Sequence, residues 1–175
     1  TVVSYARPVK GGYSTARLLV PTLADELRVQ LPGATRVVTM SMKERTAIMM
    51  AGRRGDAVTW FNASARGFVT SSAYTKEPVP FVEAFLKANP IEREFGKAWT
   101  RMLPVSQYLF EDAGDGEQPP SGWTNTFPHA LGKPPAKPDD GPGGDFYSAW
   151  EESPMSDAYL GRLAAASPPA PPTSP

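Results

Sequence analysis

The sequence has no cysteine and only one histidine among its 175 residues. The lack of cysteine excludes disulfide bonds, thiolate zinc sites and cysteine nucleophiles. His129 cannot build a zinc site by itself, because such sites draw on three or four ligands. We therefore expect His129 to be structural or simply exposed.

Net charge and long apolar runs are also missing. Eighteen basic and eighteen acidic side chains cancel, so no long-range field attracts nucleic acid or an anionic membrane. No apolar run reaches the roughly 18 residues that cross a bilayer, and no leader with a cleavage site is recognised. We expect neither a nucleic-acid partner nor a membrane span, and any anion binding must come from local placement of charge.

Two further kinds of site find little support. No Gly-x-Ser-x-Gly elbow occurs, so a Ser-His-Asp hydrolase is not indicated. The acidic residues Asp112, Asp115 and Glu117 resemble a calcium loop only loosely, since the twelve-residue ligand pattern is missing. A solvated acidic loop is the favoured interpretation.

What the sequence does contain is typical of a soluble α/β protein. Leu19, Leu23, Leu27 and Leu31 recur every four residues around a helix-compatible Pro21, which predicts an amphipathic helix ended by Pro32-Gly33. A short β-branched run follows at 36–40. Helix followed closely by strand is the order found in α/β sheets.

The remaining elements are expected as follows. Runs 57–61 and 67–71 predict a hairpin, and 80–89 and 91–102 predict two helices divided at Asn89-Pro90. Residues 111–145 are rich in Gly, Pro and Asp and predict a long irregular excursion. A last helix is expected at 156–166. The tail 167–175 is proline-rich; its Pro168–Pro171 formally matches ligands of polyproline-binding domains, a pattern common by chance.

Four aromatic residues of the hairpin region form another candidate site. Trp60, Phe61, Phe68 and Tyr74 are able to offer a platform to a nucleobase or sugar. Such sets are more often the packed face of a hairpin. We favour packing.

The most informative stretch is 37–49, which predicts a buried strand running into a helix with Lys43 and Arg45 at the junction. Ser41 and Glu44 have the spacing of a capping box, which would place both cations in the first turn. Alternatively, 43–45 is extended and the helix starts at Thr46. Cations oppose the positive helix start unless an anion joins them. A phosphate is the anion we infer, although two solvated surface cations would give the same pattern.

Several segments resemble, in order and spacing, the middle of phosphate-irrepressible alkaline phosphatases. These segments are Ala16–Leu27, Val38–Ile48, Trp60-Phe61 and Val69–Tyr74, with a looser match through Trp99 and Phe127-Pro128 to Ser153-Pro154. This family belongs to the alkaline phosphatase superfamily, with type I phosphodiesterases and nucleotide pyrophosphatases. The resemblance implies a partial alkaline-phosphatase-like sheet with flanking helices and a loop-rich, helical cap.

The resemblance also implies a chemistry. Family members are hydrolases with two zinc ions and a threonine or serine nucleophile, and a Lys-x-Arg pair that contacts the transferred phosphate falls on Lys43 and Arg45. Glu44 stands where the family usually has Asp. The expected substrate is a small phosphate ester, with monoesters favoured over diesters because a dianionic phosphate needs more cationic contact. By family, the location is periplasmic or secreted.

These observations predict a segment of a larger enzyme. We expect 1–75 to belong to the phosphatase core, 76–166 to be a cap region that returns to the core, and 167–175 to be a tail. The nucleophile and the Asp/His zinc ligands are expected in the remainder of the parent enzyme, before Thr1 and after Pro175, so the chain alone is predicted to be inactive. Two alternatives remain: a nucleotide pyrophosphatase or phosphodiesterase segment, and a non-catalytic module that binds an anion or a partner.

Overall fold

The structure, a computed structural model, describes residues 1–31, 35–119, 122–133 and 141–169. The chain divides into two units, one formed by Thr1–Asn89 with the segment that starts at Asp157, the other by Pro90–Ser156. The five α-helices of the described residues are α1 (Leu23–Gln30), α2 (Glu44–Ala51), α3 (Pro80–Ala88), α4 (Gly144–Glu151) and α5 (Pro154–Ala165). The expected α/β class is confirmed.

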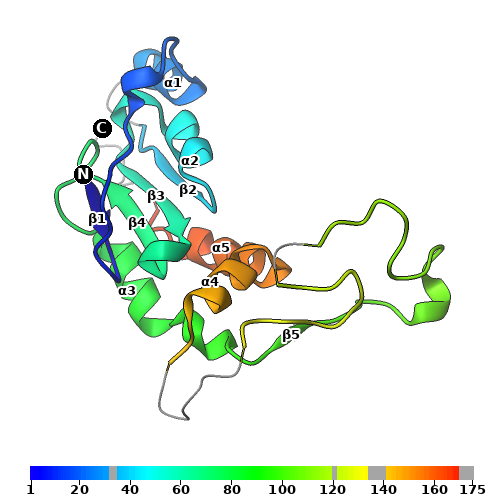
Figure 1. Cartoon of the computed structure of the whole chain (residues 1–175). Helices are drawn as coiled ribbons and strands as arrows, with labels where there is room; N and C mark the ends of the chain where they lie inside the picture. Colours follow the sequence, from blue (N-terminus) through cyan, green and yellow to red (C-terminus); the bar gives the residue numbers. More distant parts are fainter. Residues whose placement is uncertain (32–34, 120–121, 134–140, 170–175) are drawn as a thin grey trace. The chain divides into compact units, whose positions relative to one another are not determined.

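The first unit is built on a four-stranded sheet in the order β1-β4-β3-β2. Its strands are β1 (Val2–Ser4), β2 (Val38–Ser41), β3 (Ala57–Asn62) and β4 (Gly67–Ser71). β3 and β4 form the expected antiparallel hairpin, in which Phe61 lies opposite Phe68. β2 runs parallel to β3, and α2 forms the crossover between them (Figure 1).

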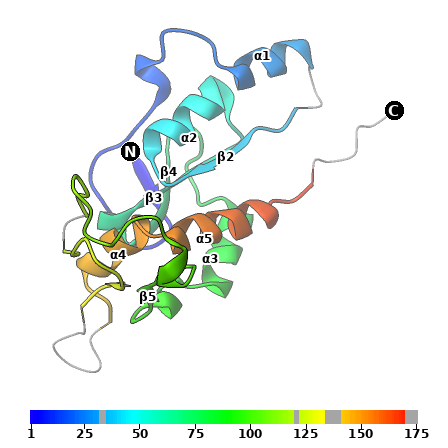
Figure 2. The same cartoon turned by 90° about the vertical axis from the view of Figure 1, so that its right-hand side faces the viewer.

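Both faces of this sheet are covered by apolar side chains. On one face, Val58 and Trp60 join Ala47 and Ala51 of α2 in a buried cluster. On the other face, the Phe68 ring stacks on Tyr159 of α5 at 5.9 Å. The side chains of a strand alternate between the two faces of its sheet, and both faces are covered here. Almost every residue of β3 is therefore buried. Figure 2 shows α2 and α5 on opposite sides of the sheet.

The helix α1 begins two residues later than Pro21 suggests. Thr22 is its N-cap, and the Thr22 hydroxyl and the Asp25 carboxylate each accept a backbone N–H of the other, in a capping box. The leucine repeat does not face the core: Leu23 is 76% exposed and Ala24 is the buried residue of the helix. The expected helix is present, and Leu27 and Leu31 of the leucine repeat are exposed as well. The predicted stop at Pro32-Gly33 lies outside the described residues.

The second unit differs most from the sequence-based expectation. The helix expected at 91–102 is a short 3₁₀ turn, Ile91–Glu94, followed by strand β5 (Ala98–Trp99). β5 pairs antiparallel with β6 (His129–Ala130). Glu94 accepts a 2.9 Å hydrogen bond from the Trp150 indole of α4, so its side chain is used for a tertiary contact. Helix α4 itself was not predicted.

Shorter 3₁₀ turns complete the secondary structure. They lie at Thr15–Arg17, Gly52–Arg54, Ala63–Ala65 and Val105–Gln107. Helices α3 and α5 agree with the expected helices within two residues at each end. The expected division at residues 75 and 166 stays a prediction.

Candidate functional site

The junction between β2 and α2 holds the two predicted phosphate ligands. β2 ends at Ser41, and α2 begins at Glu44 with Lys43 as its N-cap residue and Arg45 in its first turn. Both side chains are exposed. The structure therefore places the cations at the carboxyl end of a strand that pairs with the buried strand β3, at a helix N-terminus.

The local backbone differs from the predicted capping box. The Ser41 hydroxyl accepts the backbone N–H of Lys43 at 3.1 Å, which closes a two-residue turn before the helix. No side chain caps α2. The box fails because the helix starts at Glu44, so Ser41 lies two residues before the N-cap. The alternative start at Thr46 is also wrong.

Buried contacts fix the position of this junction. The Thr39 hydroxyl of β2 donates a 2.9 Å hydrogen bond to the Ala47 carbonyl of α2. Ala47 and Ile48 are buried in the core cluster. The first turn of α2 is thus held by its own strand, and the exposed Lys43 and Arg45 project from a fixed frame.

The Asp25 carboxylate connects α1 to the segment that follows the C-terminal end of α2. Besides capping α1, Asp25 accepts the backbone N–H of Arg53 at 2.9 Å. The Thr22 N–H and the other donors around this carboxylate hold the pKa of Asp25 below its usual value. Burial, with the Asp25 charge as a second cause, raises the pKa of Tyr74 to about 12. Sequence reasoning missed this cluster, although Thr22-x-x-Asp25 is itself a capping-box signal.

The other sequence candidates find structural roles. Trp60, Phe61 and Phe68 are at most 2% exposed, so these rings are packed in the core, as favoured. Tyr74 donates its hydroxyl to the Gly52 carbonyl at 3.1 Å. The tail motif Pro168–Pro171 extends beyond the described residues.

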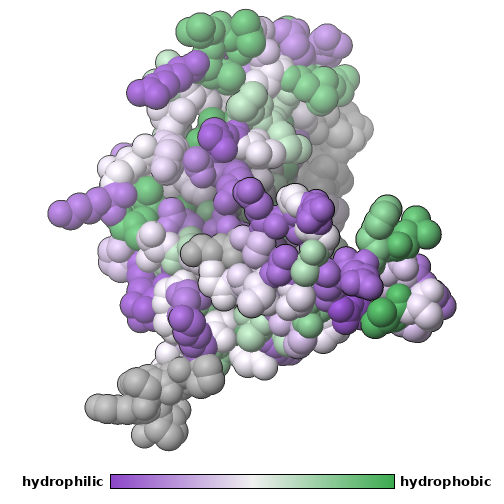
Figure 3. Space-filling view, turned by 45° about the vertical axis from the view of Figure 1, so that its right-hand side comes forward, coloured by the Kyte–Doolittle hydropathy of each residue, from purple (hydrophilic) through white to green (hydrophobic). Residues whose placement is uncertain are grey.

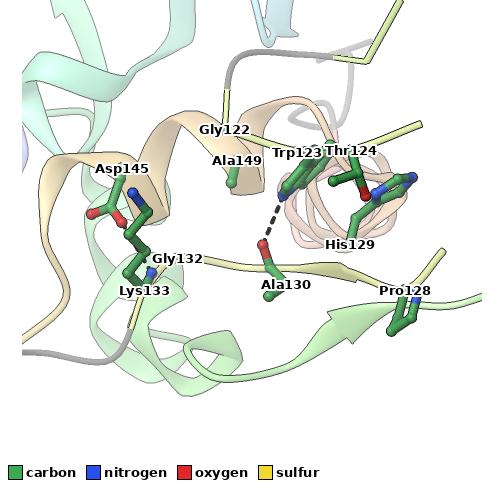
Figure 4. A pocket seen from close by; sticks show the side chains of 10 residues that line it. All are labelled: Gly122, Trp123, Thr124, Pro128, His129, Ala130, Gly132, Lys133, Asp145 and Ala149. Atoms are coloured by element: carbon green, nitrogen blue, oxygen red, sulfur yellow. Dashed lines mark hydrogen bonds between the residues drawn. The ribbon is translucent and has the colours of Figure 1, made fainter. Parts of the chain in front are cut away.

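His129 lies in an aromatic cluster of the second unit. It is 8% exposed and stacks on Trp123 at 4.9 Å, as a structural histidine does. A hollow of about 240 Å³ beside it is lined by Trp123, Thr124, Lys133 and Asp145, among others (Figure 4). In this view the Trp123 indole donates to the Ala130 carbonyl at 2.8 Å.

Asp112, one of the acidic residues considered for a calcium loop, forms an ion pair. It pairs with Arg101 and accepts the backbone N–H of Phe127 at 2.9 Å. The Phe127 N–H, followed by Arg101, holds the pKa of Asp112 below its ordinary value.

The described residues do not fit the zinc centre that the resemblance implies. Within the ranges given above, no three His, Asp or Glu side chains gather in a way that would hold a metal ion. None of the helices in those ranges combines the length and apolar character needed to cross a bilayer. The β2–α2 junction offers two cations for an anion, whereas the part of the chain that the structure describes offers no ligand set for a metal.

Comparison with solved structures defines the class of this fold as alkaline-phosphatase-like. Wild-type alkaline phosphatase PafA matches with a TM-score of 0.63 and 26% identity over 83% of this chain and 27% of that chain. A PafA variant matches with a TM-score of 0.64 and 25% identity over 83% of this chain and 28% of that one. In the variant a threonine, an asparagine, a lysine and, two positions beyond the lysine, an arginine are replaced. The chain therefore matches part of an alkaline-phosphatase-like fold, as the sequence resemblance predicted.

Particular relatives by sequence agree with this class. Alkaline phosphatase PafA of Elizabethkingia meningoseptica is 32% identical over 56% of this chain and 18% of its own length. A protein of Myroides odoratus named a calcium-transporting ATPase is 28% identical over 70% of this chain and 23% of its own length. No protein-family model matches. The chain thus spans about a fifth of the length of these relatives.

Proposed function

We propose that this chain is the phosphate-recognition segment of a metal-dependent phosphate-ester hydrolase, with Lys43 and Arg45 as the phosphate contacts. The observation that carries the proposal is their placement at the β2–α2 junction of an alkaline-phosphatase-like fold. The lysine and arginine replaced in the PafA variant have the same spacing, Lys-x-Arg. That spacing supports the assignment of Lys43 and Arg45 as a pair.

The chemistry of the junction suits a phosphate group. The unpaired N–H groups at the start of α2 carry partial positive charge. Arg45 adds a planar fork of donors and Lys43 adds a compact charge. Fixed cations of this kind stabilise the negative charge that spreads over phosphoryl oxygens in the transition state. A terminal monoester phosphate carries more charge than a diester, so we propose monoesters as substrates.

We also propose that the chain alone does not hydrolyse esters. The family's two zinc ions need Asp and His ligands, and the described residues offer no such group. In our proposal the nucleophile and the metal ligands belong to the remainder of the parent enzyme. This segment then contributes binding and charge stabilisation only.

The alternatives predict other properties. A nucleotide pyrophosphatase or phosphodiesterase would gain from an aromatic platform for a base, but Trp60, Phe61 and Phe68 are buried in the core. A non-catalytic module would bind an anion but would not restore activity to a larger protein. The Myroides relative is named for ATP-dependent transport, and phosphoryl transfer from ATP also needs cations on phosphate oxygens. By analogy with the alkaline phosphatases, we propose a periplasmic or secreted location.

A hybrid enzyme tests the function. This chain replaces the matching segment of PafA, and hydrolysis of a chromogenic monoester and of a diester is measured. We expect monoester turnover that falls roughly tenfold to a hundredfold in Lys43→Ala and in Arg45→Ala, since each removes a charged hydrogen bond of about 1.5–3 kcal/mol. The control Arg54→Ala removes another exposed arginine, just after α2.

The outcomes separate the candidates. Undiminished turnover in both junction variants contradicts the phosphate role, and faster diester cleavage favours the phosphodiesterase. The chain by itself, with added zinc, is expected to give no turnover above the blank. Clear turnover by the isolated chain refutes the proposed inactivity.

A further inference from the structure

The pocket beside His129 in the second unit combines an aromatic wall with charged side chains. Its volume is about 240 Å³, below the roughly 300–1,000 Å³ of pockets that hold drug-sized ligands. Such a volume suits a single ring. The uncovered side chains that gather over α1 in Figure 3 are hydrophobic, whereas this pocket has the mixed lining that is typical of a site for a small polar ligand.

Trp123 forms the aromatic wall and is held by three contacts. Its indole N–H donates to the Ala130 carbonyl at 2.8 Å. One face of the indole stacks on His129, with 4.9 Å between the ring centroids and 19° between the planes. Trp99 packs against the indole in a T-shaped arrangement at 5.9 Å. His129 is itself buried, so the wall stands on a rigid base.

The second face of the Trp123 indole is open. Among the described residues, no further aromatic ring stacks on it. Figure 4 shows the indole between the His129 ring and the end of the pocket that Lys133 and Asp145 line. Trp123 is only half-buried, so a ligand can lie flat against this face.

The Asp145 carboxylate at that end of the pocket is oriented by the backbone around it. Asp145 lies in the first turn of α4, and one of its oxygens accepts the backbone N–H of Lys133 at 3.0 Å. The other oxygen lies against Gly143, where an added Cβ would come within 2.5 Å of it. The carboxylate is thus fixed before any ligand arrives, which lowers the entropic cost of binding.

Lys133 adds a positive charge to the same end of the pocket. Its side chain is exposed. Because the charges of Lys133 and Asp145 cancel, the lining favours a neutral ligand over a phosphate or another anion. An ammonium group only donates hydrogen bonds and a carboxylate only accepts them. The two groups together therefore suit hydroxyl groups, each of which both donates and accepts.

A pyranose ring has the chemistry that this pocket would recognise. Its C–H groups carry a slight positive charge and suit the negative face of an indole. Its hydroxyl groups lie around the ring, where neighbouring ones can accept from Lys133 and donate to Asp145. A flat nucleobase would gain most from rings on both of its faces, but His129 already covers the other face of Trp123, and the lining holds no further aromatic ring.

We propose that this pocket of the second unit binds one pyranose ring of a carbohydrate, with Trp123 as the stacking platform and Lys133 and Asp145 as the hydroxyl partners. None of the lining residues is one of the proposed phosphate contacts, which belong to the first unit. The inference goes beyond the proposed function and does not depend on it.

Nuclear magnetic resonance of the isotope-labelled chain tests the proposal, because each tryptophan contributes its own indole N–H signal. The Trp123 signal is assigned by its absence from the spectrum of Trp123→Phe. The probes are the methyl glycosides of glucose, galactose and mannose. The fully buried indoles of Trp60 and Trp150 serve as internal references. We expect at least one glycoside to shift the Trp123 signal saturably, with a dissociation constant of about 1–10 mM.

Two variants and a matched control locate the binding. Ala149→Leu adds bulk to the pocket wall from α4, and Lys133→Ala removes the ammonium group. Ser148→Leu adds the same leucine one residue earlier, at an exposed position outside the lining. We expect Ala149→Leu to abolish the shift and Lys133→Ala to raise the dissociation constant about threefold to tenfold, the contribution of a typical hydrogen bond. Ser148→Leu should bind like the wild type, and circular dichroism checks that each variant folds.

The possible results separate the ligand classes. The absence of a saturable shift with all three glycosides overturns the proposal. Adenosine or glycine that binds at Trp123 more tightly than every glycoside also overturns it, in favour of a nucleobase or an amino acid. Glycoside binding that Ala149→Leu leaves unchanged refutes the assigned pocket. Phosphate is absent from these titrations, so their outcome is separate from the test of Lys43 and Arg45.

Discussion

Substitution of Gly52 by alanine should destabilise the first unit strongly. Gly52 ends α2 with φ +65° and ψ −154°, a conformation that only glycine adopts readily. An added Cβ would contact the Thr22 hydroxyl and come within 2.5 Å of the Asp25 carboxylate. These two groups are the capping box of α1, so one methyl group disturbs the contact between two helices.

The expected cost follows from these two effects. Backbone strain in this region is of order 1–3 kcal/mol. Displacing the cap of α1 costs about 1 kcal/mol more. We therefore expect Gly52→Ala to lower the free energy of unfolding by about 2–4 kcal/mol, which shifts the urea midpoint by roughly 1–2 M.

Urea denaturation monitored by circular dichroism measures this shift of the midpoint. The control is Gly161→Ala in α5, where an added Cβ meets nothing within 4 Å. That change should stabilise by roughly 0.5–1 kcal/mol, because alanine is the better helix former. If Gly52→Ala unfolds at the wild-type midpoint, the described contact between α1 and the end of α2 is wrong.

Two further predictions concern the same unit. The pKa of Asp25 is lowered in the folded state, so its contribution is present above the unfolded value of about 4 and is lost as pH falls through the folded pKa. Asp25→Asn should therefore reduce the free energy of unfolding at pH 7 by about 1 kcal/mol and have less effect near pH 2–3. If urea denaturation gives the same difference in unfolding free energy between wild type and variant at both pH values, this role of Asp25 is wrong. Thr39→Val keeps the side-chain shape but removes the 2.9 Å hydrogen bond to the Ala47 carbonyl. Thermal unfolding should show that the free energy of unfolding falls by about 1 kcal/mol. An unchanged melting temperature contradicts that hydrogen bond.

Regular periodicity made much of the first unit predictable, although strand β1 (Val2–Ser4) was not expected. The hairpin of β3 and β4 was expected because two β-branched and aromatic runs flank a short polar loop. Helix α3 was expected because Pro80 suits a helix start and Asn89-Pro90 ends it. Burial of α1 could not be inferred in the same way, because periodicity shows which face is apolar but not what covers it.

The second unit carries weaker local signals. Strands β5 and β6 have two residues each, too few for a period-two pattern to be recognised. The stretch 91–102 resembles a helix in composition, but Glu94 is used in a hydrogen bond to Trp150, 56 residues away. Tertiary contacts between residues that lie this far apart in the sequence override the local preference for a helix.

The candidate site was predictable in part. Its location between a strand and a helix follows from the hydrophobic pattern of 37–49, and the structure confirms that order. The position of the cap was not predictable, because Ser41 can accept an N–H either inside a helix turn or in a local turn before it. The role of Lys43 and Arg45 stays a prediction that needs a direct measurement.

A phosphate titration of the isolated chain, monitored through its amide chemical shifts, tests that role most directly. We expect saturable shifts at Lys43–Thr46 with a dissociation constant of about 1 mM, corresponding to about −4 kcal/mol. The shifts should vanish in Arg45→Ala and persist in Arg54→Ala. Saturable shifts elsewhere in the chain, with none at the start of α2, would contradict a phosphate-binding role for Lys43 and Arg45.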